Sequence, residues 1–181
     1  MHDLIDKINS TVLLQKNIIF EKANIKELDN ILKLYKERML WFKLKGIKQW
    51  SKYLTNHPKE QFAQVIEKGD YYILRKENEI IAGFEISTDS HFWDDNKSNA
   101  YYLYKVVSKV GYKNIGNEIF KIAKSITKIN KKDYLRLDCL SSNKKLNELY
   151  EKHGFKYVKE GIDSYHYTLR EWKVSENFWG Y

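Results

Sequence analysis

Apolar residues recur along the chain in two spacings, one typical of helices and the other typical of strands. Helical spacing first joins Ile25, Leu28, Ile31, Leu32, Tyr35 and Met39. An apolar run at 18–23 precedes this segment. Asn24 and Glu27, which are three residues apart, match the capping-box pattern. The pattern therefore predicts a strand at 18–23 and a helix that begins after Asn24 and ends near Gly46.

The same reasoning predicts the elements of the remaining chain. Helical periodicity is found in three later segments, 59–68, 116–128 and 143–154. Strand-like runs occupy 71–87, where two runs flank the polar stretch KENE as in a hairpin, and then 101–108, 134–140, 155–160 and 165–172. The polar segment 88–100 is expected to be an exposed loop. The predicted order is β-α-α-β-β-β-α-β-α-β-β, which indicates a mixed α/β sheet with parallel crossovers near its middle.

The length and the turn residues favour one domain. The chain has 181 residues, one proline and eight glycines, with no Pro/Gly/Ser-rich linker and no internal repeat. A compact domain usually has about 100–200 residues. We therefore expect a single domain over 1–181, with an N-terminal arm at 1–17 and an aromatic C-terminal tail at 172–181.

Charge and hydropathy restrict the partners. The net charge is +8, but the excess is nearly all lysine and is spread along the chain, with arginine only at Arg38, Arg75, Arg136 and Arg170. We therefore expect no nucleic-acid partner, although a mildly positive surface favours a polyphosphate ligand.

No apolar run approaches the ~20 residues of a membrane helix. The N-terminal residues do not form a secretory signal, so we expect no membrane partner and a cytoplasmic location.

Metal-binding and disulfide patterns are missing from the sequence. Cys139 is the only cysteine, and in mid-strand it is expected to be a small buried hydrophobe. The histidines, at positions 2, 57, 91, 153 and 166, have no metal-ligand spacing. We expect no metal cofactor.

The stretch GYKNIG at 111–116 connects the strand 101–108 to a helix. A helix N-terminus at 113–117 would offer unpaired N–H groups and the positive end of the helix dipole to a phosphate, with Lys109 and Lys113 adding positive charge. Taken alone, the turn is more often an ordinary connection between a strand and a helix than a phosphate site.

The stretch from Tyr101 to Phe155 resembles the core of the GCN5-related N-acetyltransferase (GNAT) superfamily. The segments YLYKVV, NIGNEIFKIAKSI, LRLDCLSSN and LYEKHGF follow one another in the superfamily's order, and LYEKHGF is the most specific match. The resemblance implies a twisted, mostly antiparallel mixed sheet with a central splayed parallel strand pair, flanked by helices. The superfamily turn reads Arg/Gln-x-x-Gly-x-Gly/Ala, whereas this chain has Gly111, Asn114 and Gly116. Asparagine replaces glycine best, because it enters the left-handed backbone region more readily than other residues.

The function that the resemblance implies is acetyl-CoA-dependent N-acetyl transfer. The acceptor would be the primary amine of a small molecule that attacks directly in a ternary complex, and the chain would be a monomer or homodimer without a metal. A weaker resemblance of GIKQW, YLYKVV and LRLDC to a bacterial branch makes a toxin or an antibiotic a candidate acceptor. The alternative is a GNAT-fold module that binds CoA and has lost turnover, as the altered turn suggests.

The resemblance also implies roles for individual residues. Tyr150 in LYEKHGF would be the general acid that protonates the leaving sulfur, although a tyrosine on this helix face could instead belong to the core. The residues expected to contact the cofactor are Val106, Val107 and Ser108 at the pantetheine and acetyl group, Lys113, Asn114, Ile115, Gly116 and Asn117 at the pyrophosphate, and Asn143 at the CoA arm.

Several residues are candidates for the general base and for the pocket that binds the acceptor amine. Glu85 is a candidate general base, with Tyr104 and Asp89 as competitors, and amine entry through ordered water would need no base. Trp41, Trp50 and Trp93, with Phe42 and Phe92, could line an acceptor pocket to which Asp89, Asp94 and Asp95 attract a cationic amine. Equally, Trp41, Phe42 and Trp50 could be core residues, and the acids could only solvate a loop.

Overall fold

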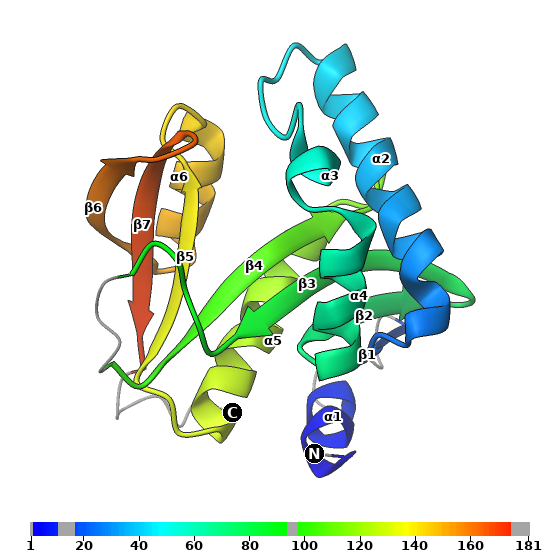
Figure 1. Ribbon diagram of the computed structural model, residues 1–181. Helices are drawn as coiled ribbons and strands as arrows, with labels where there is room; N and C mark the ends of the chain where they lie inside the picture. Colours follow the sequence, from blue (N-terminus) through cyan, green and yellow to red (C-terminus); the bar gives the residue numbers. More distant parts are fainter. Residues whose placement is uncertain (1, 11–16, 94–97, 175–181) are drawn as a thin grey trace. The chain divides into compact units, whose positions relative to one another are not determined.

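The computed structural model describes residues 2–10, 17–93 and 98–174 (Figure 1). Its strands are β1 (Ile18–Lys22), β2 (Tyr71–Lys76), β3 (Glu79–Ser87), β4 (Ala100–Ser108), β5 (Tyr134–Leu140), β6 (Lys156–Ile162) and β7 (His166–Lys173). They are hydrogen-bonded in the order β1-β2-β3-β4-β5-β7-β6. Strands β4 (Ala100–Ser108) and β5 (Tyr134–Leu140) pair in parallel, whereas β1 with β2, β2 with β3, and β7 with both β5 and β6 pair antiparallel. The predicted mixed, mostly antiparallel sheet with a parallel pair is confirmed.

The chain forms two compact units. The first contains residues 1–86 and 104–119, and the second contains residues 87–103 and 120–181. Strand β4 and helix α5 (Ile115–Ile129) contribute residues to both units. The expected single domain stays a prediction.

In the first unit, two helices pack on an antiparallel sheet (Figure 1). The strands are β1 (Ile18–Lys22), β2 (Tyr71–Lys76) and β3 (Glu79–Ser87), and the main helices are α2 (Leu28–Leu44) and α4 (Lys59–Lys68). Their buried side chains form one cluster that includes Ile31, Tyr35, Phe62, Ile66, Tyr71 and Ile73. This burial gives most of the driving force for the unit, since a fully buried large apolar side chain contributes about 1.5–3 kcal/mol.

The ends of these elements have local causes. The predicted capping box is present, because the Asn24 side chain accepts from the Lys26 N–H and Glu27 accepts from the Asn24 N–H. It begins the short 3-10 helix η3 (Ile25–Glu27), which leads into α2. Helix α4 ends at Gly69, whose φ of 78° is readily adopted by glycine.

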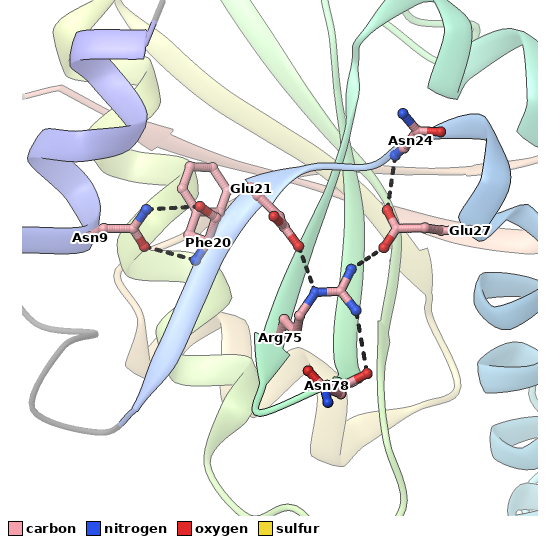
Figure 2. Close-up of polar contacts among 7 residues, drawn as sticks. All are labelled: Asn9, Phe20, Glu21, Asn24, Glu27, Arg75 and Asn78. Carbon is pink, nitrogen blue, oxygen red and sulfur yellow. Dashed lines mark hydrogen bonds and ion pairs between the residues drawn. The ribbon is translucent and has the colours of Figure 1, made fainter.

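Polar side chains tie the first strands together (Figure 2). The guanidinium of Arg75 on β2 donates to Glu21 on β1 at 2.7 Å and also to Glu27 of η3. The amide of Asn9 bonds both the N–H and the C=O of Phe20, at 2.8 and 2.9 Å (Figure 2). Asn9 thus satisfies backbone groups that β1 would otherwise present at a sheet edge.

In the second unit, β5 pairs with β7 (His166–Lys173), which pairs in turn with β6 (Lys156–Ile162). Helix α6 (Lys144–Lys152) covers the face of β5 and β7 that carries Cys139 and Arg170, because Asn147 of α6 hydrogen-bonds both side chains. Side chains alternate along a strand. Asp138 therefore belongs to the opposite face, as does Tyr167, which is paired with Leu140.

Two short helices were not predicted. Helix α1 (His2–Ile8) lies within the expected N-terminal arm, and α3 (Tyr53–Asn56) precedes α4. Residues 11–16 of the arm and 175–181 of the aromatic tail lie outside the described residues. Among the described residues, no helix combines the length and hydropathy needed to cross a bilayer.

Candidate active site

Strand β4 bends at Lys105, whose φ of 48° lies in the left-handed region. Hydrogen bonds hold both the backbone and the side chain of this residue. The Tyr35 hydroxyl donates to the Lys105 carbonyl, and the Lys105 ammonium donates to Glu85 at 2.6 Å. Tyr35 in turn shares a 3.0 Å hydrogen bond with the hydroxyl of Tyr71. A non-glycine residue in this region costs of order 1–3 kcal/mol, so these contacts compensate for a backbone strain placed directly before Val106.

The absence of a side chain at Gly83 gives Tyr71 its position. A Cβ built on Gly83 would lie 2.5 Å from the Tyr71 hydroxyl and 2.9 Å from its ring. Burial raises the pKa of both Tyr35 and Tyr71 above the ordinary value. Both hydroxyls therefore stay protonated at neutral pH and can keep Lys105 in place.

Glu85, the predicted base, lies on β3 and is 7% exposed. Its carboxylate accepts from the Lys105 ammonium, and the two side chains are 10% and 12% exposed. Lys105 therefore compensates the charge of Glu85. Removing either partner would leave a buried charge, at a cost of about 3–5 kcal/mol.

The residues expected to meet the acetyl group and pantetheine form the end of β4. Val106 and Ser108 are partly buried, and Val107 is 2% exposed in the core cluster, so Val107 could contact a ligand only through its backbone. The guanidinium of Arg38 on α2 donates to the Ser108 carbonyl at 2.5 and 2.9 Å, to the Ser108 hydroxyl at 3.1 Å and to the Lys109 carbonyl at 3.0 Å. Arg38, which the sequence did not indicate, thus fixes the start of the turn.

The predicted pyrophosphate turn enters α5 through Asn114, whose φ is 63°. Gly111 has a φ of 93°, and no atom lies within 4 Å of a Cβ built at Gly111 or Gly116. Lys113 and Asn114 are exposed at the helix N-terminus. The exposed lysine and the N–H groups of the first helical turn are donors of the kind that a pyrophosphate requires.

The ammonium of Lys109 is paired with a carboxylate of β3. Its ammonium donates to Glu79 at the start of β3, and the Tyr112 hydroxyl donates to the same carboxylate at 3.2 Å. We expected Lys109 to add positive charge at the turn. Instead, Glu79 compensates this charge and helps to hold the turn, which leaves Lys113 as the exposed cation next to the helix start.

Tyr150 lies on α6 and is 6% exposed. Its ring packs against Phe120 and Phe155, with centroid distances of 5.4 and 5.8 Å, as the core alternative would require. Its hydroxyl has no hydrogen-bond partner among the described residues, and burial raises its pKa above the ordinary value of about 10. The Tyr150 hydroxyl is therefore protonated at neutral pH. Because it donates to none of the described residues, it can donate a hydrogen bond to a ligand.

Other predicted residues of α6 and its surroundings have local structural roles. Asn143 is the N-cap of α6, with its side-chain oxygen accepting from the Leu146 N–H at 3.1 Å. His153 is the C-cap residue of the same helix. Cys139 is buried, which raises its pKa to about 12 and argues against a nucleophilic thiolate.

The three tryptophans that we predicted to line a pocket are divided between the two units. Trp41 and Trp50 are partly buried in the first, and Trp93 is 7% exposed in the second. Trp50 has a φ of 62° and stacks on Tyr53 at 4.8 Å. Trp93 lies 4.3 Å from the Arg136 guanidinium. Asp94 and Asp95 lie outside the described residues.

The parallel strand pair separates part of the way along β5. Ala100, Tyr101 and Tyr102 pair with Tyr134, Leu135 and Arg136, and the pairing ends there. The remainder of β5 carries Asp138, whose carboxylate accepts from the Tyr165 hydroxyl. The expected splayed pair is thus seen in the register, and Asp138 is a second residue that the sequence did not indicate.

Each unit therefore brings together a different part of the predicted site. The first unit holds Glu85, the end of β4 and the turn into α5, and the second holds Tyr150, Asn143 and Trp93. Within the described ranges, no three His, Cys, Asp or Glu side chains form a group suited to a metal ion.

Comparison with known proteins identifies the family. Residues 41–169 match the family model of the acetyltransferase (GNAT) domain. The uncharacterized N-acetyltransferase YesJ of Bacillus subtilis (strain 168) is 23% identical over 139 residues, which cover 72% of this chain and 77% of YesJ. Since the family model spans more than half of its length, the chain belongs to the GNAT acetyltransferase family.

Solved structures show the same fold. A GNAT-family acetyltransferase from Listeria monocytogenes 4b F2365 is 22% identical with a TM-score of 0.74, over 87% of this chain and 95% of that one. The PaiA N-acetyltransferase of Thermoplasma acidophilum, solved in complex with coenzyme A, is 19% identical with a TM-score of 0.67, over 87% of this chain and 99% of that one.

Proposed function

We propose that this chain is an acetyl-CoA-dependent N-acetyltransferase that acts on the primary amine of a small molecule, by direct attack in a ternary complex. The observation that carries the proposal is the turn into α5, where Asn114 occupies a glycine position of the family pattern and adopts a left-handed backbone, which is the conformation that glycine tolerates best. This turn presents a helix N-terminus and Lys113 to an anion. Family membership and the CoA-bound Thermoplasma structure support the same co-substrate.

The reaction forms a C–N bond and breaks the C–S bond of the thioester. A neutral amine attacks the carbonyl carbon, negative charge develops on the carbonyl oxygen, and the sulfur leaves as a thiolate. Backbone N–H groups at Val106 and Val107, placed by the bend at Lys105, are the proposed donors to the oxygen. Glu85 is the proposed acceptor of the amine proton, and it could take that proton only if its pairing with Lys105 changes.

Tyr150 is the proposed donor to the leaving sulfur. Burial raises its pKa, which keeps the hydroxyl protonated but makes it a weaker acid than an exposed tyrosine. A thiol has an ordinary pKa of about 8.5, so the thiolate does not need a complete proton transfer in order to leave. Hydrogen-bond donation by Tyr150 to the developing thiolate is therefore the role that fits its environment.

Replacing Tyr150 with phenylalanine tests this role. Because the ring contacts with Phe120 and Phe155 remain, we expect Tyr150→Phe to keep its fold and its acetyl-CoA affinity, while turnover falls about 100-fold or more. Calorimetric titration with acetyl-CoA measures affinity, and thiol release with a panel of small amines measures turnover. Tyr157→Phe is the matched control, because Tyr157 is 55% exposed on β6. Unchanged turnover in Tyr150→Phe would reject Tyr150 as the donor to the leaving sulfur.

A CoA-binding module without turnover is the second candidate. The pairing of Glu85 with Lys105 favours it, since the Lys105 ammonium already occupies the carboxylate that would have to accept the amine proton. Binding of acetyl-CoA without thiol release across the amine panel would support this candidate. If acetyl-CoA does not bind, both proposals fail.

A further inference from the structure

We propose that Asp138, with the rings of Phe92, Tyr165 and Tyr167, forms a binding site for the positively charged group of an amine. Asp138 lies on β5, beyond the last residue that pairs with β4. Its link to an acceptor rests on the proposed N-acetyltransferase function, which requires an amine near the splayed strands. The site itself is defined within the second unit.

The carboxylate of Asp138 has a hydrogen bond but, within the part of the chain that the structure describes, no counter-charge. It is partly buried and accepts from the Tyr165 hydroxyl. No basic side chain among the described residues forms an ion pair with it. Arg136, on the same face of β5, is paired with Glu171 at 2.7 Å. Burial raises the pKa of Asp138, which is the effect of desolvation without a neighbouring cation.

Three aromatic rings form a cluster, and the Tyr165 hydroxyl connects this cluster to the carboxylate. The centroid of Phe92 lies 4.5 Å from that of Tyr167 and 5.9 Å from that of Tyr165, and the two tyrosine rings are 6.1 Å apart. All three side chains are only partly buried. They come from two segments, since Phe92 follows β3, whereas Tyr165 directly precedes β7 and Tyr167 belongs to it.

A carboxylate bonded to a cluster of partly exposed rings favours a cation over a neutral or anionic ligand. The ring faces attract an ammonium group electrostatically, and the carboxylate supplies a charge-assisted hydrogen bond. Binding an ammonium would also compensate the desolvated charge of Asp138. The ligand class is therefore a primary amine that binds in its protonated form and carries an apolar chain. Such an amine loses that proton to solvent before it attacks the thioester, because only the neutral amine is a nucleophile.

The test compares two ligands of similar shape, butylammonium and 1-butanol, in the absence of acetyl-CoA. NMR titration of the aromatic resonances at pH 7 gives the affinity of each ligand for the full chain. Butylamine is protonated at this pH, as a lysine side chain is. We expect wild-type protein to bind butylammonium about tenfold or more tightly than 1-butanol, and Asp138→Asn to abolish most of this preference.

Asp163→Asn is the matched control, because it removes one negative charge from a side chain that is 50% exposed in the β6–β7 loop. It should leave the preference nearly unchanged. Phe92→Leu is the second variant, which keeps the carboxylate and should lower butylammonium affinity more than 1-butanol affinity. The proposal is overturned if wild-type protein does not prefer butylammonium, or if Asp138→Asn and Asp163→Asn have equal effects.

Failure of this site is distinguishable from failure of the proposed function. Butylammonium binding is measured without acetyl-CoA, and acetyl-CoA binding is measured without an amine. Loss of the cation preference with normal acetyl-CoA binding rejects only the role of Asp138. Absence of acetyl-CoA binding rejects the proposed function, whatever the amine titration shows.

Discussion

Arg38 is the side chain that connects the long helix α2 to the end of β4. Its guanidinium is partly buried and donates four hydrogen bonds to Ser108 and Lys109. It also lies 5.1 Å from the ring of Trp41. A planar guanidinium can make this set of contacts, whereas the single ammonium of lysine cannot reproduce its geometry. Arg38 is therefore well placed to position the turn that leads to α5.

We expect Arg38→Lys to weaken acetyl-CoA binding about tenfold, because the carbonyls at the start of the turn lose their fixed donor. The free energy of unfolding should fall by about 1–3 kcal/mol. Arg75→Lys is the control, because the Arg75 guanidinium bonds Glu21, Glu27 and Asn78 and, among the described residues, bonds nothing in the turn at 109–117 (Figure 2). This substitution should lower stability without changing affinity. Calorimetric titration and urea unfolding measure the two effects. Equal affinities in wild type and Arg38→Lys would contradict the positioning role.

Among the helices and strands, α5 has the N-terminus most closely tied to function. It begins at Ile115, directly after left-handed Asn114. A glycine adopts this backbone without a Cβ penalty, whereas alanine pays roughly 1–2 kcal/mol. The backbone at position 114 can therefore be tested separately from the asparagine side chain.

We expect Asn114→Gly to bind acetyl-CoA as well as wild type or better, and Asn114→Ala to bind more weakly and to unfold about 1 kcal/mol more easily. Lys131, with a φ of 52° after the end of α5, provides the control. Lys131→Gly removes the Cβ from a left-handed residue outside the turn, so it should raise stability by about 1 kcal/mol without affecting affinity. Acetyl-CoA affinity that is unchanged in Asn114→Ala would indicate that the turn does not hold the pyrophosphate.

Most elements could be predicted because their causes are local. The helix expected at 59–68 and the strand expected at 134–140 coincide with α4 and β5. Each has a periodic apolar pattern, and α4 also has a glycine stop. Helix α3 has only four residues, which is too short to show a helical period.

The candidate site could be predicted only in part. The turn at 109–117 and Tyr150 belong to local motifs, and their roles stay predictions. Arg38 and Asp138 could not be found in this way, because their partners are distant in the sequence. Arg38 contacts Ser108 across 70 residues, and Asp138 contacts Tyr165 across 27. No local pattern encodes such pairs, which depend on how the elements pack.

The molecule as a whole contains two cores that share continuous elements. Strand β4 contributes 100–103 to the second unit and 104–108 to the first, and α5 is divided in the same way at 119–120. A strand or helix that loses its packing along half of its length loses support for the other half, because its backbone hydrogen bonds form cooperatively. This continuity favours the single domain that the sequence predicts.

We therefore expect one cooperative unfolding transition, and substitutions in either core should lower its Tm. Phe62 in the first unit and Phe155 in the second are 0% and 1% exposed, so Phe62→Ala and Phe155→Ala should each cost about 3–5 kcal/mol. In a chain of this size each should lower Tm by about 10 °C, as followed by circular dichroism and by tryptophan fluorescence. Ile162→Ala is the control, because Ile162 is 81% exposed and its loss should barely change Tm. Two transitions, each displaced by only one of the core substitutions, would show instead that the units unfold independently, since a single domain cannot lose one core while keeping the other.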